Sequence, residues 1–146
     1  MPGDTPHLET TLEAGELIAF INVPEGPWAR RSRYVKVRDR DSYQFAVVAA
    51  AVALHLDEGW VREARVALGG VASIPWRAHA AEEVLRGRRL DEALATRAAA
   101  AAFAEASTRA HNAFKRGLGE RTLVRALLET AALEITDEHG RAASAR

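Results

Sequence analysis

The chain contains no cysteine among its 146 residues. This absence excludes disulfides, thiol catalysis, and zinc or iron–sulfur sites ligated by cysteine on this chain. A surplus of charge is also lacking, because 20 basic and 20 acidic residues give a formal net charge of zero. Nucleic-acid-binding proteins usually carry a basic surplus, since their affinity comes from releasing counterions at phosphates. We therefore expect no nucleic-acid partner.

Membrane-spanning runs and catalytic motifs are lacking as well. The longest apolar run, FAVVAAAVAL from Phe45, is much too short to cross a bilayer, and the start MPGDTPHLET is not a secretory signal. The five histidines have no metal-binding spacing, and the chain has no P-loop, no G-x-S-x-G elbow and no complete dinucleotide fingerprint. We expect no catalytic residues, no metal site and no membrane partner. The expected location is the cytoplasm, with the periplasm open if a partner is exported.

The order of the sequence patterns predicts one α+β domain. Proline and β-branched residues concentrate before about residue 75, and alanine, leucine, arginine and glutamate dominate afterwards. The expected fold is a small antiparallel sheet of about four strands, followed by three helices packed on one face. The predicted domain spans residues 15–135, between a linker or N-terminal arm, 1–14, and a frayed tail, 136–146. Strands are predicted at about 16–23, 33–38, 45–56 and 60–68, and the turn signal DEG, residues 57–59, joins the last two into a long hairpin. Helices are predicted at about 76–86, 91–107 and 111–135, with Asp91 close to the start of the second.

Two local patterns add detail to this fold. The glycines of "LGG", residues 68–70, follow a strand, and we interpret them as a close approach or a left-handed turn rather than a dinucleotide site. On the last helix, one apolar stripe is predicted to face the core. It consists of Phe114, Leu118, Val124, Leu128, Ala131 and Ile135, with Arg121 inside it as a snorkelling side chain.

The stretch RRSRYVKVRDR, Arg30–Arg40, is the strongest functional pattern, with six basic residues and one acidic residue. Strand alternation directs Val35 and Val37 to the core and Lys36 to the opposite face. A solvated strand face and an anion or cofactor site are both compatible with this arrangement. In the second interpretation, Tyr34 or Tyr43 adds an aromatic surface.

Four segments together resemble a known family. They are LEAGELIAFINVP, SRYVKVRDRDSYQFAVVAAAVAL, VREARVALGGVASIPWRAHAAEEVLRG and HNAFKRGLGERTLVRALLETA. They resemble the C-terminal domain of the FAD-binding subunit of molybdenum hydroxylases, the family of xanthine dehydrogenase, aldehyde oxidoreductase and carbon monoxide dehydrogenase. The resemblance covers about residues 8–133. Its most specific parts are Y-x-K-x-x-x-R and A-R-x-A-L-G-G-V-A-x-x-P-x-R-A.

The resemblance implies an α+β sandwich and FAD as the cofactor. In the family, most FAD contacts come from an upstream domain with glycine-rich pyrophosphate loops, and this sequence does not contain that domain. The family's flavin-contacting lysine corresponds to Lys36, and an aromatic ring at Tyr43 or Phe45 is implied against the isoalloxazine. The implied partners are an FAD-binding domain or chain, the molybdopterin large subunit and the 2Fe-2S subunit.

Two functions are compatible with these observations. In the first, the chain is the C-terminal part of a molybdenum-hydroxylase FAD-binding subunit. It supports electron transfer through FAD but is inactive alone, with FAD absent from the isolated chain. The alternative is a non-catalytic structural or protein-interaction module that has lost flavin binding. In that case the basic strand and the loop around Trp28 form an interaction surface.

Overall fold

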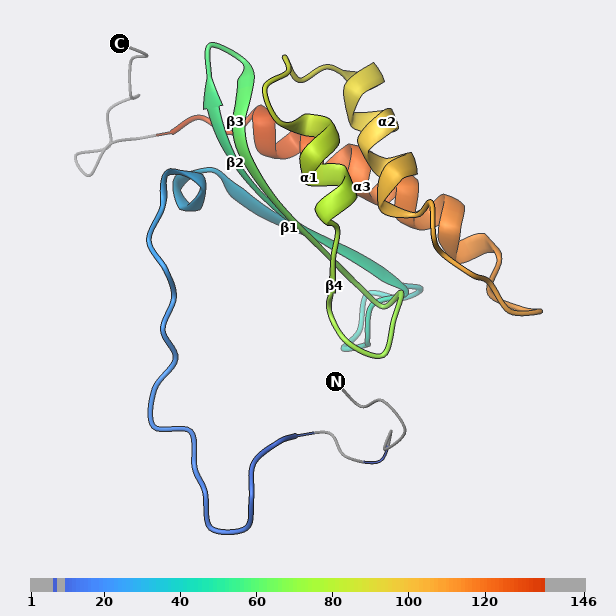
Figure 1. Cartoon of the computed structure of the whole chain (residues 1–146). Helices are drawn as coiled ribbons and strands as arrows, with labels where there is room; N and C mark the ends of the chain where they lie inside the picture. Colours follow the sequence, from blue (N-terminus) through green and yellow to red (C-terminus); the bar gives the residue numbers. More distant parts are fainter. Residues whose placement is uncertain (1–6, 8–9, 136–146) are drawn as a thin grey trace.

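This computed structural model describes residue 7 and residues 10–135. Within these residues, a four-stranded antiparallel sheet in the order β1-β2-β3-β4 forms the centre of the fold, and three helices lie on one side of it (Figure 1). The predicted fold class is therefore confirmed. The elements in chain order are the 3-10 helix η1 (Pro27–Arg30), β1 (Ser32–Val37), β2 (Val48–Asp57), β3 (Trp60–Gly69), β4 (Trp76–Arg77), α1 (His79–Leu85), α2 (Glu92–Ala102) and α3 (Phe114–Ala131).

The long hairpin of β2 and β3 forms the two central strands of the sheet, as the sequence predicted. Its turn consists of Glu58 and Gly59, which both have positive φ angles, 48° and 82°. Strand alternation then directs one side of each strand into the core, where Leu54 and Leu68 are fully buried. The predicted start at Phe45 was too early, because β2 begins at Val48 and the preceding residues belong to the connection from β1.

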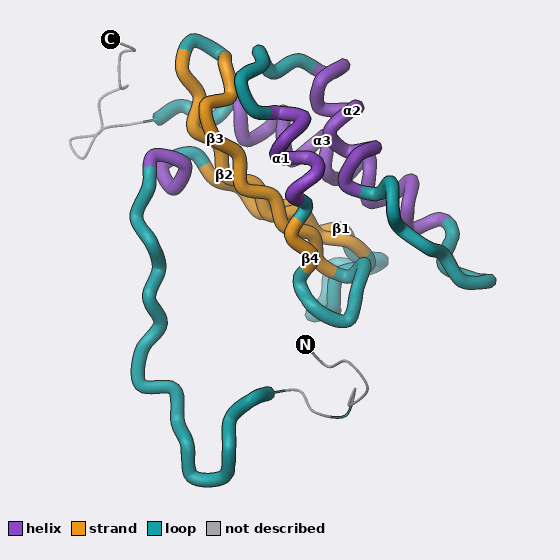
Figure 2. Tube along the Cα trace, viewed as in Figure 1, coloured by secondary structure: helices purple, strands orange, loops and turns teal. Residues whose placement is uncertain are grey.

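The predicted strand at residues 16–23 is wrong, although the number of strands is right. Those residues have no strand partner, and they run away from the domain as an extended segment (Figure 2). The fourth strand is instead β4, which pairs with β3 through Arg77 opposite Ala67 and Trp76 opposite Leu68. This pairing also delays α1, predicted from residue 76, to His79. Sequence patterns indicate an extended conformation, but they do not identify the neighbouring strand.

The helix α2 begins where its capping residue predicts and ends earlier than expected. The Asp91 side chain accepts a hydrogen bond from the Leu94 N–H at 2.6 Å, as an N-cap does. The helix ends at Ala102, so residues 103–107, predicted to be helical, lie outside it. Phe103 then turns into the core, where Gly119 of α3 leaves room for its ring. A Cβ atom at Gly119 would lie 2.3 Å from Phe103 Cζ.

The stripe predicted on α3 is not the face of the helix that is buried. Phe114 is 59% exposed, whereas Val124, Leu128 and Ala131 only flank the core. Arg121 is exposed rather than held within a buried stripe. The buried face consists of Gly119, Thr122, Leu123, Ala126, Leu127 and Thr130. Small residues occupy most of this face because α3 packs closely on α2 and β2. A prediction based on the large apolar side chains of α3 therefore selects residues at the edge of its buried face.

The predicted tail, 136–146, and most of the predicted linker, 1–14, lie outside the described residues. Within the part of the chain that the structure describes, no helix has both the length and the apolar character needed to cross a membrane.

Candidate functional site

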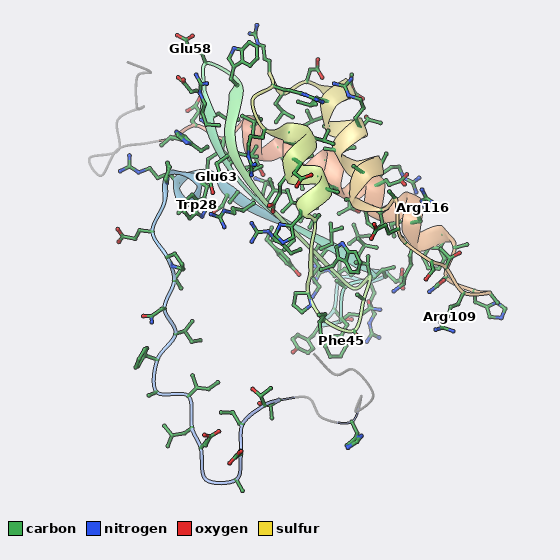
Figure 3. All side chains as sticks on the ribbon, viewed as in Figure 1. Trp28, Phe45, Glu58, Glu63, Arg109 and Arg116 are labelled. Atoms are coloured by element: carbon green, nitrogen blue, oxygen red, sulfur yellow. The ribbon has the colours of Figure 1, made fainter. Side chains whose placement is uncertain are left out.

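The predicted site residues lie at one end of the sheet, where the β1–β2 connection begins and ends. The Lys36 ammonium donates a hydrogen bond to the Gln44 carbonyl oxygen at 2.6 Å, which brings the lysine against this connection. Tyr43 and Phe45 flank Gln44, and their side chains are 97% and 93% exposed. Figure 3 shows Phe45 at this end and Glu58, in the hairpin turn, at the other. Both aromatic rings are thus available to a binding partner.

The strand register of β1 places Lys36 as the alternation predicted. Val35 is buried in the core with 7% of its surface exposed, and Lys36 is exposed on the opposite face. Val37, the last residue of the strand, is only half-buried, so it contributes less to the core than expected. Lys36 therefore belongs to the sheet face that the helices leave open.

Replacing Lys36 by alanine is expected to change the free energy of unfolding by no more than about 0.5 kcal/mol, because the side chain is exposed. The matched control is Val35→Ala at the preceding position, which removes two buried methyl groups and is expected to cost about 2 kcal/mol. Urea denaturation of both variants measures the difference. Equal losses would show that Lys36 is a structural residue.

A second connection, between β3 and β4, lies beside the first. Gly70 has a φ of +73°, and a Cβ atom there would lie 2.8 Å from the Val47 carbonyl oxygen. The close-packed, left-handed turn predicted for "LGG" is therefore confirmed at Gly70. Lys115 of α3 donates a hydrogen bond to the Gly70 carbonyl oxygen at 3.0 Å. Sequence reasoning missed Lys115, although it belongs to the HNAFK segment that contributed to the resemblance.

The arginines around Lys36 make contacts within the domain. Arg31 donates to the carbonyl oxygen of Ala131, at the end of α3, at 2.7 Å. Arg33 forms an ion pair with Glu129 of α3 at 2.6 Å. A hydrogen bond from Arg125, and then the charges of Arg125 and Arg33, hold the pKa of Glu129 below its ordinary value. These arginines attach β1 to α3, so the basic stretch is in part a structural feature.

The open face of the sheet has a shallow concavity of about 340 Å³. Tyr34, Ala51, Ala67 and Arg77 lie side by side across its four strands. Lys36 does not line this concavity. It lies beyond the end of this row, beside the β1–β2 connection. The small side chains of Ala51 and Ala67 line this concavity.

The side chains at this end of the sheet can make binding contacts. An exposed ammonium group and two exposed aromatic rings can contact a planar molecule with anionic or electronegative atoms at its edge. Over residue 7 and residues 10–135, no group of three or more histidine, aspartate or glutamate side chains is placed to hold a metal ion.

The chain matches the model of a known protein family. The model of the CO dehydrogenase flavoprotein C-terminal domain family matches residues 33–130. The aldehyde oxidoreductase FAD-binding subunit of Escherichia coli is 43% identical over 133 residues, which cover 90% of this chain and 38% of that protein. The carbon monoxide dehydrogenase medium chain of Afipia carboxidovorans is 36% identical over 95 residues, covering 65% of this chain and 33% of that one.

Solved structures with the same fold come from related enzymes. Quinoline 2-oxidoreductase from Pseudomonas putida matches with a TM-score of 0.65 and 27% identity, over 69% of this chain and 36% of that one. Carbon monoxide dehydrogenase from Hydrogenophaga pseudoflava matches with a TM-score of 0.62 and 28% identity, over 68% and 36%. This chain spans 38% of the length of the E. coli protein and 33% of the A. carboxidovorans protein.

Proposed function

Because the chain belongs to the CO dehydrogenase flavoprotein C-terminal domain family, we propose that it acts as the C-terminal part of a molybdenum-hydroxylase FAD-binding subunit. In that role it supports electron transfer through FAD and has no catalytic activity alone. The observation that carries the proposal is the match over residues 33–130, together with 43% identity to an FAD-binding subunit. The main FAD-binding part corresponds to the length of that subunit which this chain does not span.

Lys36 is the proposed flavin contact, and the geometry at the end of the sheet fits this role. Its ammonium group is exposed, held by the Gln44 carbonyl, and adjacent to a connection that exposes Tyr43 and Phe45. FAD, when bound, supplies the electron-accepting and electron-donating chemistry. Lys36 would place positive charge near the pyrimidine edge of the ring and so favour the reduced form. Tyr43 or Phe45 would cover the ring.

The wider assembly is also part of the proposal. An FAD-binding domain or chain would complete the flavin site, and a molybdopterin large subunit and a 2Fe-2S subunit would exchange electrons with it. The relatives support this assembly, because one is an FAD-binding subunit and another is the medium chain of an enzyme. We propose a cytoplasmic location for the assembly and a functional domain that spans residues 15–135.

The chain purified alone is expected to show no flavin absorbance, because this domain supplies only the edge contacts to FAD. Mixed with the FAD-binding part of the E. coli relative, expressed without the region that this chain matches, it should form a complex with higher FAD affinity. Visible absorbance and fluorescence titration with FAD measure both results.

Stoichiometric FAD that survives purification of the isolated chain would overturn the proposal. Formation of the complex without any change in FAD affinity or flavin spectrum would instead favour the structural module.

A further inference from the structure

The extended segment before η1, residues 10–26 (the arm), exposes several large apolar side chains. It extends away from the sheet and helices (Figure 1). The exposed fractions are 79% for Leu17, 76% for Phe20, 79% for Ile21 and 81% for Val23. No backbone hydrogen bond joins residues 17–23 to a strand in the described part of the chain. An apolar run of this kind in water indicates a surface that another element covers.

The sequence of the arm is that of a strand buried on both faces. In an extended chain, Leu17, Ala19, Ile21 and Val23 lie on one face, and Ile18, Phe20 and Asn22 lie on the other. A half-buried strand would alternate apolar and polar residues, whereas a nearly continuous apolar run is typical of a strand covered on both sides. Pro24 follows directly and ends the run. The arm therefore needs a sheet with both faces covered.

The comparisons indicate where that sheet lies. The family model begins at residue 33, so the arm precedes the matched region. The similarity to the E. coli FAD-binding subunit nevertheless covers 90% of this chain, an extent that includes Leu17–Val23. The arm is thus shared with a complete subunit, most of which this chain does not span.

We propose that Leu17–Val23 adds as a strand to a sheet in the FAD-binding part of the subunit and so attaches this domain to it. The inference rests on the proposed function and names the segment that holds the two parts together. Backbone N–H and C=O groups of the arm would pair with a neighbouring strand, as in other cases of strand addition. Phe20 and Ile21 point to opposite faces and would anchor the two sides.

The test is a double variant, Phe20→Asp with Ile21→Asp, which places a charge on each face of the arm. We expect its Kd for the FAD-binding part of the E. coli relative, expressed without the matched region, to rise by about 100-fold or more in titration calorimetry. The melting temperature of the isolated chain should not change, because Phe20 and Ile21 are exposed and do not pack on the rest of the domain. The matched control is Phe114→Asp, the same exchange at a phenylalanine that is 59% exposed on α3.

Chymotrypsin gives an independent readout of the arm. It should cut after Phe20 in the free chain and leave this bond intact in the complex. Equal protection in the free chain would overturn the inference, since the arm would then fold on its own domain or on a second copy. Association that survives the double variant, or is lost equally in Phe114→Asp, would also overturn it. The proposed function fails separately, if the unaltered chain does not bind the FAD-binding part at all.

Discussion

Replacing Glu82 by alanine is expected to lower the free energy of unfolding by about 3 kcal/mol, because its carboxylate joins three elements inside the domain. The side chain is buried, and its Oε1 accepts a hydrogen bond from the backbone N–H of Val66 at 2.7 Å. The Arg77 guanidinium donates to the same carboxylate at 2.5 Å. Without Glu82, the Val66 N–H loses its acceptor and Arg77 of β4 loses its ion pair with α1.

The matched control is Glu83→Ala, the same exchange at the next position of α1, where the side chain is exposed. It should change stability by no more than about 0.5 kcal/mol. Urea denaturation monitored by circular dichroism compares the two variants. If both variants lose equal stability, the buried carboxylate does not hold β4 to α1 and the packing account is wrong.

Replacing Gly70 by alanine is expected to destabilise the domain by about 3 kcal/mol and to displace the connection that carries Phe45. The backbone φ of +73° is strained for any residue with a Cβ atom, which accounts for about 1–2 kcal/mol. The added Cβ would also lie 2.8 Å from the carbonyl oxygen of Val47 and 2.9 Å from that of Ala46. Both obstacles are backbone atoms, so relief requires a shift of the β1–β2 connection.

Two other glycines distinguish the backbone strain at a positive φ from the steric clash of an added Cβ atom. Gly87→Ala has a similar φ of +69° but nothing within 4 Å of the added Cβ, so it should show only the strain. Gly69→Ala has no positive φ and an ordinary contact at 3.5 Å with Ala49, so it should be nearly neutral. The expected order of destabilisation in thermal denaturation is Gly70, then Gly87, then Gly69. A Gly70 variant as stable as the Gly69 variant would show that the two connections do not touch.

Local patterns predicted most of the fold because hairpins and helix starts depend on neighbouring residues. The turn residues Glu58 and Gly59 indicated the long hairpin, and the capping residue Asp91 indicated the start of α2. The alternation of β1 predicted the burial of Val35 and the exposure of Lys36. These features needed no knowledge of distant contacts.

The errors arose where long-range packing decides the outcome. The buried face of α3 is set by its fit against Phe103 and the sheet, so glycine, alanine and threonine occupy much of it. The short strand β4 exists because Trp76 and Arg77 reach the edge of β3, which no local pattern in their sequence indicates. The position of Lys115 beside Gly70 depends on the fold in the same way.

The midpoint potential of the flavin in the complex with the FAD-binding part tests the central claim most directly. The Lys36→Met variant removes the charge and keeps a similar length, and Lys115→Met is the matched control at the same end of the sheet. We predict that the potential of the Lys36 variant falls by roughly 30 mV or more, whereas the control changes little. An unchanged potential and an unchanged FAD affinity in the Lys36 variant would contradict the assignment of Lys36 to the flavin.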